Sequence, residues 1–182
     1  AHLAETLVAE LSRPIVVQDR QVFLGTSVGV TLFPDDASGA TMLTRPLSSM
    51  STFAPGHRLN SGPFGTMGVG MPFGVGAKAA RPAAKVVVLH GDGSFGLNAM
   101  ELDTAVRHRL PLLVVISLNG GWTADPERNK PGRELGYTRF DRLAESLGCH
   151  GEHVERAEDI GPALRRAAAA VEAGRVALVN VV

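Results

Sequence analysis

The chain has a single cysteine among its 182 residues, few aromatic residues and no net charge, since 18 basic residues balance 18 acidic ones. A lone Cys149 excludes a disulfide framework within the chain and favours a reducing compartment. A neutral chain gives no indication of binding to nucleic acid or to an anionic membrane. No apolar run approaches the roughly 18 residues that a membrane-spanning helix needs. We therefore expect a cytoplasmic protein that binds neither nucleic acid nor membranes. A secretory signal is not expected either, because His2, Glu5 and Glu10 interrupt the first apolar stretch.

Two apolar runs each end in a polar, glycine-rich turn. Val86–Leu89 leads into residues 90–96, and Leu112–Ile116 leads into residues 117–121. Continuous apolar runs of this length indicate buried parallel strands, and the stretch between them, residues 97–110, is typical of a helix. In parallel α/β sheets, ligands bind at the carboxyl ends of the strands. The two turns are therefore expected at the same edge of one sheet.

The first turn has the spacing G-x-G-x-x-G, which is typical of dinucleotide-binding sites. Such a site also needs an acidic residue at the end of the next strand, where this chain has Asn119. The turn itself carries Asp92, and a carboxylate repels a pyrophosphate unless a cation lies between them. Asp92 and Asn119 offer the hard oxygen ligands that Mg²⁺ prefers, and the glycines expose backbone N–H groups that can hold a diphosphate. His90, at the end of the first strand, is a candidate acid–base group without an identifiable orienting partner.

The order of Gly-Asp-Gly-Ser at residues 91–94, a helix, a strand and Asn119 resembles the diphosphate-binding motif of thiamine diphosphate (ThDP) enzymes. That family has Asn-Asn where this chain has Leu118-Asn119, and its second Asn is the metal ligand. The resemblance implies that Asp92, Asn119 and the backbone carbonyl of Gly121 bind Mg²⁺. It also implies that the cofactor is contacted by Gly91, Gly93, Ser94, Asn119 and Gly121.

A second segment, residues 60–70, resembles the part of acetolactate synthase-like ThDP enzymes that lies under the aminopyrimidine ring. The resemblance implies that the carbonyl of Gly65 accepts a hydrogen bond from the ring's amino group and that Met67 wedges the cofactor into its bent shape. Methionine suits a wedge because its side chain is apolar, polarisable and adaptable. The members resembled are acetolactate synthase, oxalyl-CoA decarboxylase and 2-hydroxyacyl-CoA lyase. They imply a reaction that cleaves or forms carbon–carbon bonds in 2-oxo acids, 2-hydroxyacyl-CoA or oxalyl-CoA.

Residues 1–45 resemble instead the C-terminal part of a GGDEF (diguanylate cyclase) domain, on Leu11-Ser12-Arg13-Pro14, residues 22–30 and residues 33–36. The pattern predicts a short helix over residues 1–11 and a β-hairpin that pairs Ile15–Val17 with a strand within Val22–Phe33. The Gly-Gly-Asp-Glu-Phe motif itself is absent, so no cyclase activity is implied. We expect a domain boundary near residue 46 and few contacts between residues 1–45 and the rest.

The expected fold is α/β, a parallel sheet with helices on both faces, preceded by the short helix and hairpin. Beyond the two runs, the pattern predicts a long polar loop over residues 120–137, helices over 68–80, 140–147 and 160–173, and strands over 150–154 and 176–182. ThDP enzymes take an activating glutamate from a separate pyrimidine-binding domain, which this sequence does not show. We therefore expect an incomplete enzyme, inactive alone, whose intact form is a homo-oligomer.

Two other classes of function stay open at this point. One is a Rossmann-type dinucleotide-binding module, and the other is a non-catalytic signalling or interaction fragment. The sequence assigns no catalytic residue within the chain and identifies neither a substrate nor a direction of reaction.

Overall fold

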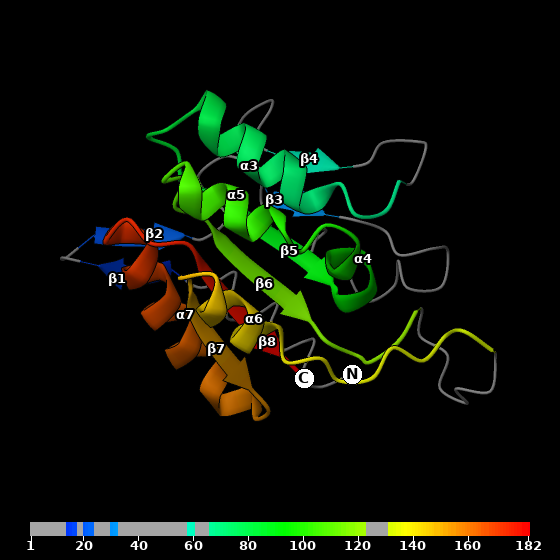
Figure 1. Cartoon of the computed structure of the whole chain (residues 1–182). Coiled ribbons are helices and arrows are strands. Elements are labelled where there is room, and N and C mark those ends of the chain that lie inside the picture. Colours follow the sequence, from blue (N-terminus) through cyan, green and yellow to red (C-terminus); the bar gives the residue numbers. More distant parts are fainter. Residues whose placement is uncertain (1–13, 18–19, 24–29, 33–57, 61–65, 123–130) are drawn as a thin grey trace.

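A six-stranded parallel sheet forms the centre of the molecule. The computed structural model describes residues 14–17, 20–23, 30–32, 58–60, 66–122 and 131–182. The strands of the sheet are β3 (Val30–Leu32), β4 (Arg58–Asn60), β5 (Val87–Gly91), β6 (Leu113–Ser117), β7 (His150–Val154) and β8 (Ala177–Val181). Their order is β4-β3-β5-β6-β8-β7 (Figure 1). Two further strands, β1 (Pro14–Val17) and β2 (Arg20–Phe23), form a separate antiparallel pair.

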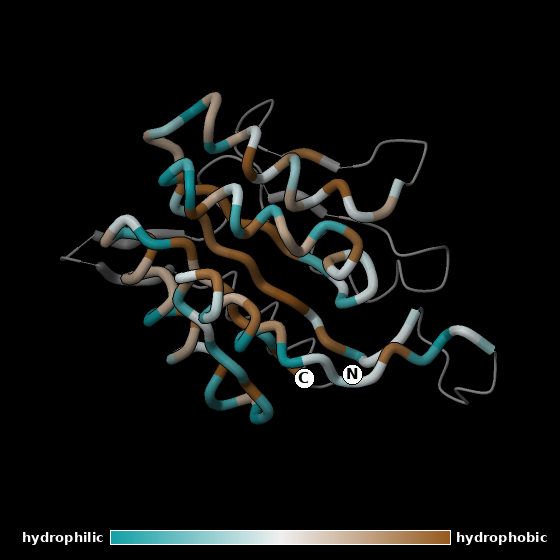
Figure 2. The backbone as a smooth tube through the Cα atoms, viewed as in Figure 1, coloured by the Kyte–Doolittle hydropathy of each residue, from teal (hydrophilic) through white to brown (hydrophobic). Residues whose placement is uncertain are grey.

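Helices cover both faces of this sheet, as the sequence predicts. They are α3 (Gly70–Ala80), α4 (Asp92–Leu97), α5 (Glu101–Arg107), α6 (Phe140–Ser146) and α7 (Ala157–Glu172). Ile160 and Leu164 of α7 pack with Val115 on one face, whereas α3 to α6 supply Met71, Phe95, Leu102 and Phe140 to the other. Alternate residues of each strand point to opposite faces, and both faces are covered, which is why Val87–Leu89 of β5 and Leu113–Ile116 of β6 are continuously apolar (Figure 2). None of the helices in the described ranges is long and apolar enough to span a bilayer.

The helix predicted over residues 97–110 is wrong in its bounds. The chain is already helical at Asp92, in the turn itself, and the helix ends at Leu97 before a second one begins at Glu101. The side chain of Asn98 donates a hydrogen bond of 2.9 Å to the carbonyl of Gly68, a residue far away in the sequence. This tertiary contact holds Asn98 outside helical geometry, with φ −137° and ψ 34°. The remaining predicted helices and strands from residue 68 onward are present within a few residues of their expected bounds.

The expectation for residues 1–45 is wrong at one strand. The predicted hairpin is present in part, because β1 pairs with β2, but β3 lies in the main sheet, parallel to both β4 and β5. Val30 pairs with Val87, so this part of the chain contributes a strand to the sheet that carries the expected site. Backbone pairing with two neighbours outweighs the local preference for a hairpin. The expected helix over residues 1–11 and the expected boundary near residue 46 lie outside the described residues.

Two glycines of α3 differ in the space around them and provide a matched test of this packing. A Cβ atom at Gly74 would lie 2.4 Å from Cγ2 of Val88 on β5, whereas one at Gly76 would meet nothing within 4 Å. We expect Gly74→Ala to lower the free energy of unfolding by about 1–3 kcal/mol because it overpacks the helix against the sheet. The control Gly76→Ala should raise it by about 0.5–1 kcal/mol, since alanine restricts the unfolded chain. Urea denaturation measures both, and equal effects would contradict the helix placement.

Candidate functional site

Asp92 is a buried carboxylate at the carboxyl end of β5. The strand ends at Gly91, whose extended backbone (φ −80°, ψ 155°) turns the chain directly into α4, so that Asp92 is the first helical residue. Its side chain is only 3% exposed. Oδ2 of Asp92 accepts a hydrogen bond of 2.9 Å from the backbone N–H of Gly120, in the loop after β6. The turn after one strand is thereby joined to the turn after its neighbour.

Burial raises the pKa of Asp92, although four backbone N–H groups oppose this by hydrogen bonding, those of Gly93, Gly120, Asp92 itself and Gly121. In the described part of the chain, no ion pair includes this carboxylate. Its charge is therefore balanced by amide dipoles alone, in surroundings that favour the neutral form. A bound cation would lower the free energy of the ionised form directly, which is the electrostatic condition for a metal ligand.

Asn119 lies in the same place, at the end of β6. Its Oδ1 accepts a hydrogen bond of 3.0 Å from the N–H of Gly121, which forms a local side-chain turn. The intervening Gly120 has φ +75°, a conformation that favours glycine. The structure thus brings Asp92 and Asn119 to the same pair of glycines. Sequence reasoning predicted that both strand ends would meet here, and the geometry agrees.

The expected oxygen ligands at the ends of β5 and β6 are few, which suits Mg²⁺ better than a cation whose ligands all come from the protein. Among the described residues there is no group of three or more His, Cys, Asp or Glu side chains. The expected ligands are one carboxylate, one side-chain amide and one backbone carbonyl, of Asp92, Asn119 and Gly121. Such a set leaves coordination positions for phosphate oxygens and water, as Mg²⁺ sites commonly do. That these three groups bind a metal stays a prediction.

Two short backbone segments lie over the first turn of α4; we call them the covering segments, residues 120–122 and 133–135. The N–H of Trp122 donates to the carbonyl of Arg133 at 2.8 Å, and the N–H of Leu135 donates to that of Gly120 at 2.9 Å. A Cβ atom at Gly93 would lie 2.8 Å from Cε3 of Trp122 and 3.1 Å from Cδ1 of Leu135. Both side chains therefore pack on Gly93. Sequence reasoning missed them, although the chain's single tryptophan directly after two glycines is a signal that it could have used.

The segment before α3 is tied to α4 by the side chains of Ser94 and Asn98. The buried Oγ of Ser94 accepts a hydrogen bond of 3.0 Å from the N–H of Gly68, and Asn98 donates to the carbonyl of the same glycine. Gly68 has φ +78°. These contacts place the half-buried Met67 beside the start of the site. Its role as a wedge stays a prediction, and Gly65 lies outside the described residues.

His90 does not suit the acid–base role that the sequence left open. It is completely buried on β5, and burial lowers its pKa to about 3. Its ring makes an edge-to-face contact with Phe95, whose ring in turn contacts Phe140 in the same manner, with centroids 5.9 Å and 5.0 Å apart respectively. A histidine that stays neutral throughout the physiological range packs the core and does not exchange protons with a substrate.

Comparison with known proteins gives consistent matches. The family described as thiamine pyrophosphate enzyme, C-terminal TPP binding domain, matches residues 38–181. A probable acetolactate synthase of Mycobacterium bovis is 41% identical over 141 residues, which are 72% of this chain and 25% of that protein. A 2-hydroxyacyl-CoA lyase 2 of Mus musculus is 31% identical over 180 residues, covering 92% of this chain and 28% of that protein.

A solved structure shares the fold. The thiamine diphosphate-dependent 4-hydroxybenzoylformate decarboxylase of Rhodococcus jostii RHA1 superposes with a TM-score of 0.73 at 24% identity, over 98% of this chain and 32% of that one. The chain thus spans about a quarter to a third of the length of these relatives. The mouse match necessarily extends into residues 1–45, because it covers 92% of the chain. None of the matches named here supports the resemblance of those residues to a GGDEF domain.

The contact between Trp122 and Gly93 is directly testable. We expect Gly93→Ala to displace the tryptophan ring, which would shift its fluorescence to longer wavelength and lower the free energy of unfolding by about 1–3 kcal/mol. Gly96→Ala in the same helix is the control, because a Cβ atom there meets nothing within 4 Å. It should leave the emission unchanged. Emission spectra and urea denaturation of the three proteins decide the matter, and an unshifted spectrum in Gly93→Ala would contradict the placement of Trp122.

Proposed function

Because this chain belongs to the thiamine pyrophosphate enzyme family, as its C-terminal TPP-binding domain, we propose that it binds the diphosphate of ThDP through Mg²⁺ at the turn after β5. The proposed metal ligands are Asp92, Asn119 and the backbone carbonyl of Gly121. The proposed cofactor contacts are Gly65, Met67, Gly91, Gly93, Ser94, Asn119 and Gly121. The proposed ThDP-binding unit comprises residues 46–182, to which β3 adds a strand.

One observation carries this proposal above the others. A buried carboxylate at the carboxyl end of β5 is held by amides of the loop after β6, and its pKa is raised because it is buried. In a dinucleotide-binding turn, a carboxylate at this position would repel the pyrophosphate. A divalent cation between Asp92 and a diphosphate removes that repulsion and uses both anions as ligands. The arrangement therefore favours a metal-bridged diphosphate over a Rossmann-type ligand.

The chain's own share of the chemistry is binding and orientation. When bound, ThDP supplies a nucleophilic carbon and an electron sink for the reaction. The turn Gly91–Ser94 would present backbone N–H groups to the diphosphate, and Gly93 has no side chain in the space that Trp122 and Leu135 fill. Trp122 and Leu135 pack on the same turn, where apolar side chains exclude water and strengthen electrostatic contacts beneath them. Met67 would support the ring from one side only.

We further propose that the chain is the pyrophosphate half of an enzyme that cleaves or forms carbon–carbon bonds in 2-oxo acids, 2-hydroxyacyl-CoA or oxalyl-CoA. The acetolactate synthase and 2-hydroxyacyl-CoA lyase relatives support this class. The activating glutamate would come from a pyrimidine-binding domain of another chain or segment, in a homo-oligomeric enzyme. The chain by itself should bind ThDP weakly and turn over no substrate, because holding the ring needs a second wall.

Calorimetric titration of the full chain with ThDP tests the metal bridge. We expect weak binding that requires Mg²⁺ and falls by at least about tenfold in Asp92→Asn, as loss of a metal ligand or of its support usually does. Asp103→Asn is the matched control, since this aspartate lies on the exposed side of α5 and pairs with Arg107. Binding that ignores both Mg²⁺ and Asp92→Asn would refute the proposal. Decarboxylation by the purified chain alone would refute the proposal that the chain turns over no substrate without a pyrimidine-binding domain.

A second test uses the pH dependence of stability without cofactor. Because the folded-state pKa of Asp92 is raised above 3.8, the folded chain binds more protons than the unfolded chain between that value and the raised one. The stability of the wild-type chain relative to Asp92→Asn should therefore fall as the pH rises through this window and be constant above it. Thermal unfolding of both proteins across the window measures this. Above this window, Mg²⁺ with ThDP should raise the stability of the wild-type chain relative to Asp92→Asn again. A relative stability that rises with pH in the absence of cofactor would contradict a raised pKa of Asp92.

A further inference from the structure

Asn180 is a polar residue in a place where the sheet is otherwise apolar. It lies on β8, completely buried, between Ile116 of β6 and His153 of β7 in the register of the sheet. Leu178, two residues earlier and hence on the same face, packs in the cluster that contains Phe95 and Phe140. Asn180 therefore lies on the face of the sheet that carries α4, one residue before the carboxyl end of its strand.

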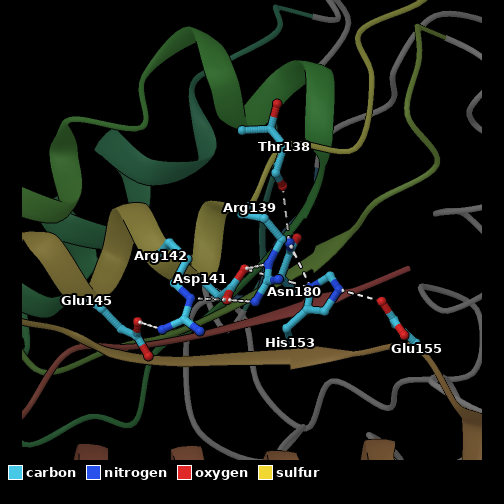
Figure 3. A network of polar contacts seen from close by, with 8 residues as sticks. All are labelled: Thr138, Arg139, Asp141, Arg142, Glu145, His153, Glu155 and Asn180. Atoms are coloured by element: carbon cyan, nitrogen blue, oxygen red, sulfur yellow. Dashed lines mark hydrogen bonds and ion pairs between the residues drawn. The ribbon is translucent and has the colours of Figure 1, made fainter.

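The amide of Asn180 reaches toward the end of the loop that follows the covering segments. Its Nδ2 donates to the backbone carbonyl of Thr138 at 3.3 Å and lies 3.5 Å from Nδ1 of His153 (Figure 3). Its Oδ1 is buried without a hydrogen-bond partner among the described residues. An unpaired buried carbonyl costs free energy, and a leucine would fill the same space without that cost. A residue that weakens the fold locally points to a role other than stability.

The neighbouring charges hold the same short stretch in place. Arg139, directly after Thr138, donates two hydrogen bonds to the buried carboxylate of Asp141, at 2.8 Å and 2.6 Å. Burial acts to raise the pKa of Asp141, but the hydrogen bond and charge of Arg139 outweigh it and hold the pKa below its ordinary value. Nδ1 of His153 lies 3.7 Å from the same carboxylate, while its Nε2 contacts Glu155 at 3.1 Å. Thr138 is thus bound to β8 through Asn180, while Arg139 pairs with Asp141 at the start of α6, whose carboxylate lies beside His153 of β7.

This anchor lies three residues beyond the second covering segment. Residues 133–135 pair with residues 120–122, and the N–H groups of Gly120 and Gly121 in that first segment oppose the raised pKa of Asp92 by hydrogen bonding to it. A displacement at Thr138 would move Leu135, and with it the backbone that pairs with Gly120. The contacts form a continuous path from β8 to the first turn of α4.

We propose that Asn180 is a positioning residue, which keeps the covering segments seated on Gly93 by holding the carbonyl of Thr138. Its effect on cofactor binding rests on the proposed function above, whereas its effect on the covering segments does not. Among the described residues, the side chain of Asn180 forms hydrogen bonds with none of the expected metal ligands or cofactor contacts.

The test replaces Asn180 by leucine and measures Trp122 in the full chain. We expect Asn180→Leu to keep or raise the free energy of unfolding, to make the tryptophan more accessible to acrylamide, and to weaken Mg²⁺-dependent ThDP binding about fivefold, the equivalent of one lost hydrogen bond. Gly74→Ala serves as a control for general destabilisation, because it overpacks α3 against Val88 and should leave acrylamide quenching unchanged. A merely structural role would lower stability in Asn180→Leu without changing the accessibility of Trp122, and that result would overturn the proposal.

Arg139→Gln provides a second variant at an exposed position, since the Arg139 side chain is 49% exposed, and it removes a partner of the buried carboxylate of Asp141. Removing its ion pair should increase acrylamide quenching in the same direction, because Arg139 directly follows Thr138. If Asn180→Leu does not fold, Asn180→Ala decides the question, since it removes the same hydrogen bond to the carbonyl of Thr138. Unchanged quenching in Asn180→Ala would then overturn the proposal. If the wild-type chain binds no ThDP, the proposed function fails, while the quenching comparison still decides the positioning role.

Discussion

The hydrogen bond between the buried carboxylate of Asp92 and the N–H of Gly120 is the contact on which the candidate site depends. It joins the turn after β5 to the turn after β6, so both must lie at one edge of a parallel sheet. A buried carboxylate needs several donors, and the backbone can supply them only where the chain turns tightly, which explains the left-handed conformation of Gly120. The absence of a side chain at Gly93 then lets Trp122 and Leu135 lie directly over the same turn.

Polar groups are buried at this edge of the sheet and almost nowhere else in the described core. Asp92, Ser94 and Asn180 are each at most 3% exposed, whereas the strand interiors are made of valine, leucine, isoleucine and alanine. Each such group lowers stability unless it is fully hydrogen-bonded. These polar groups are concentrated at the carboxyl ends of β5 and β8, where they lower the stability of the fold. This is also the edge at which open α/β sheets bind their ligands.

The sequence predicted most of the core from residue 68 onward and the two halves of the site. The continuous apolar runs Val86–Leu89 and Leu112–Ile116 predict strands that are buried on both faces. The Ala-rich stretch of α7 is followed by a glycine with φ +87°, which is typical of the end of a helix. Local pattern failed where a distant partner decided the conformation. Asn98 leaves the helix because it binds Gly68, and Val30 joins the sheet because Val87 and Arg58 pair with its strand.

By itself, then, the sequence determined the class of the fold and the family, since apolar periodicity and a glycine-rich motif with fixed spacing are local properties of the chain. It also placed Asp92 and Asn119 at neighbouring strand ends, because parallel strands joined by one helix leave few other topologies. Only the tertiary structure decided what surrounds them: the packing of Trp122 on Gly93, the tie from Ser94 to Gly68, and the anchor of Thr138 on Asn180. These contacts join residues separated by 26 to 42 positions, and no local pattern encodes them because each depends on how packed elements bring distant side chains together.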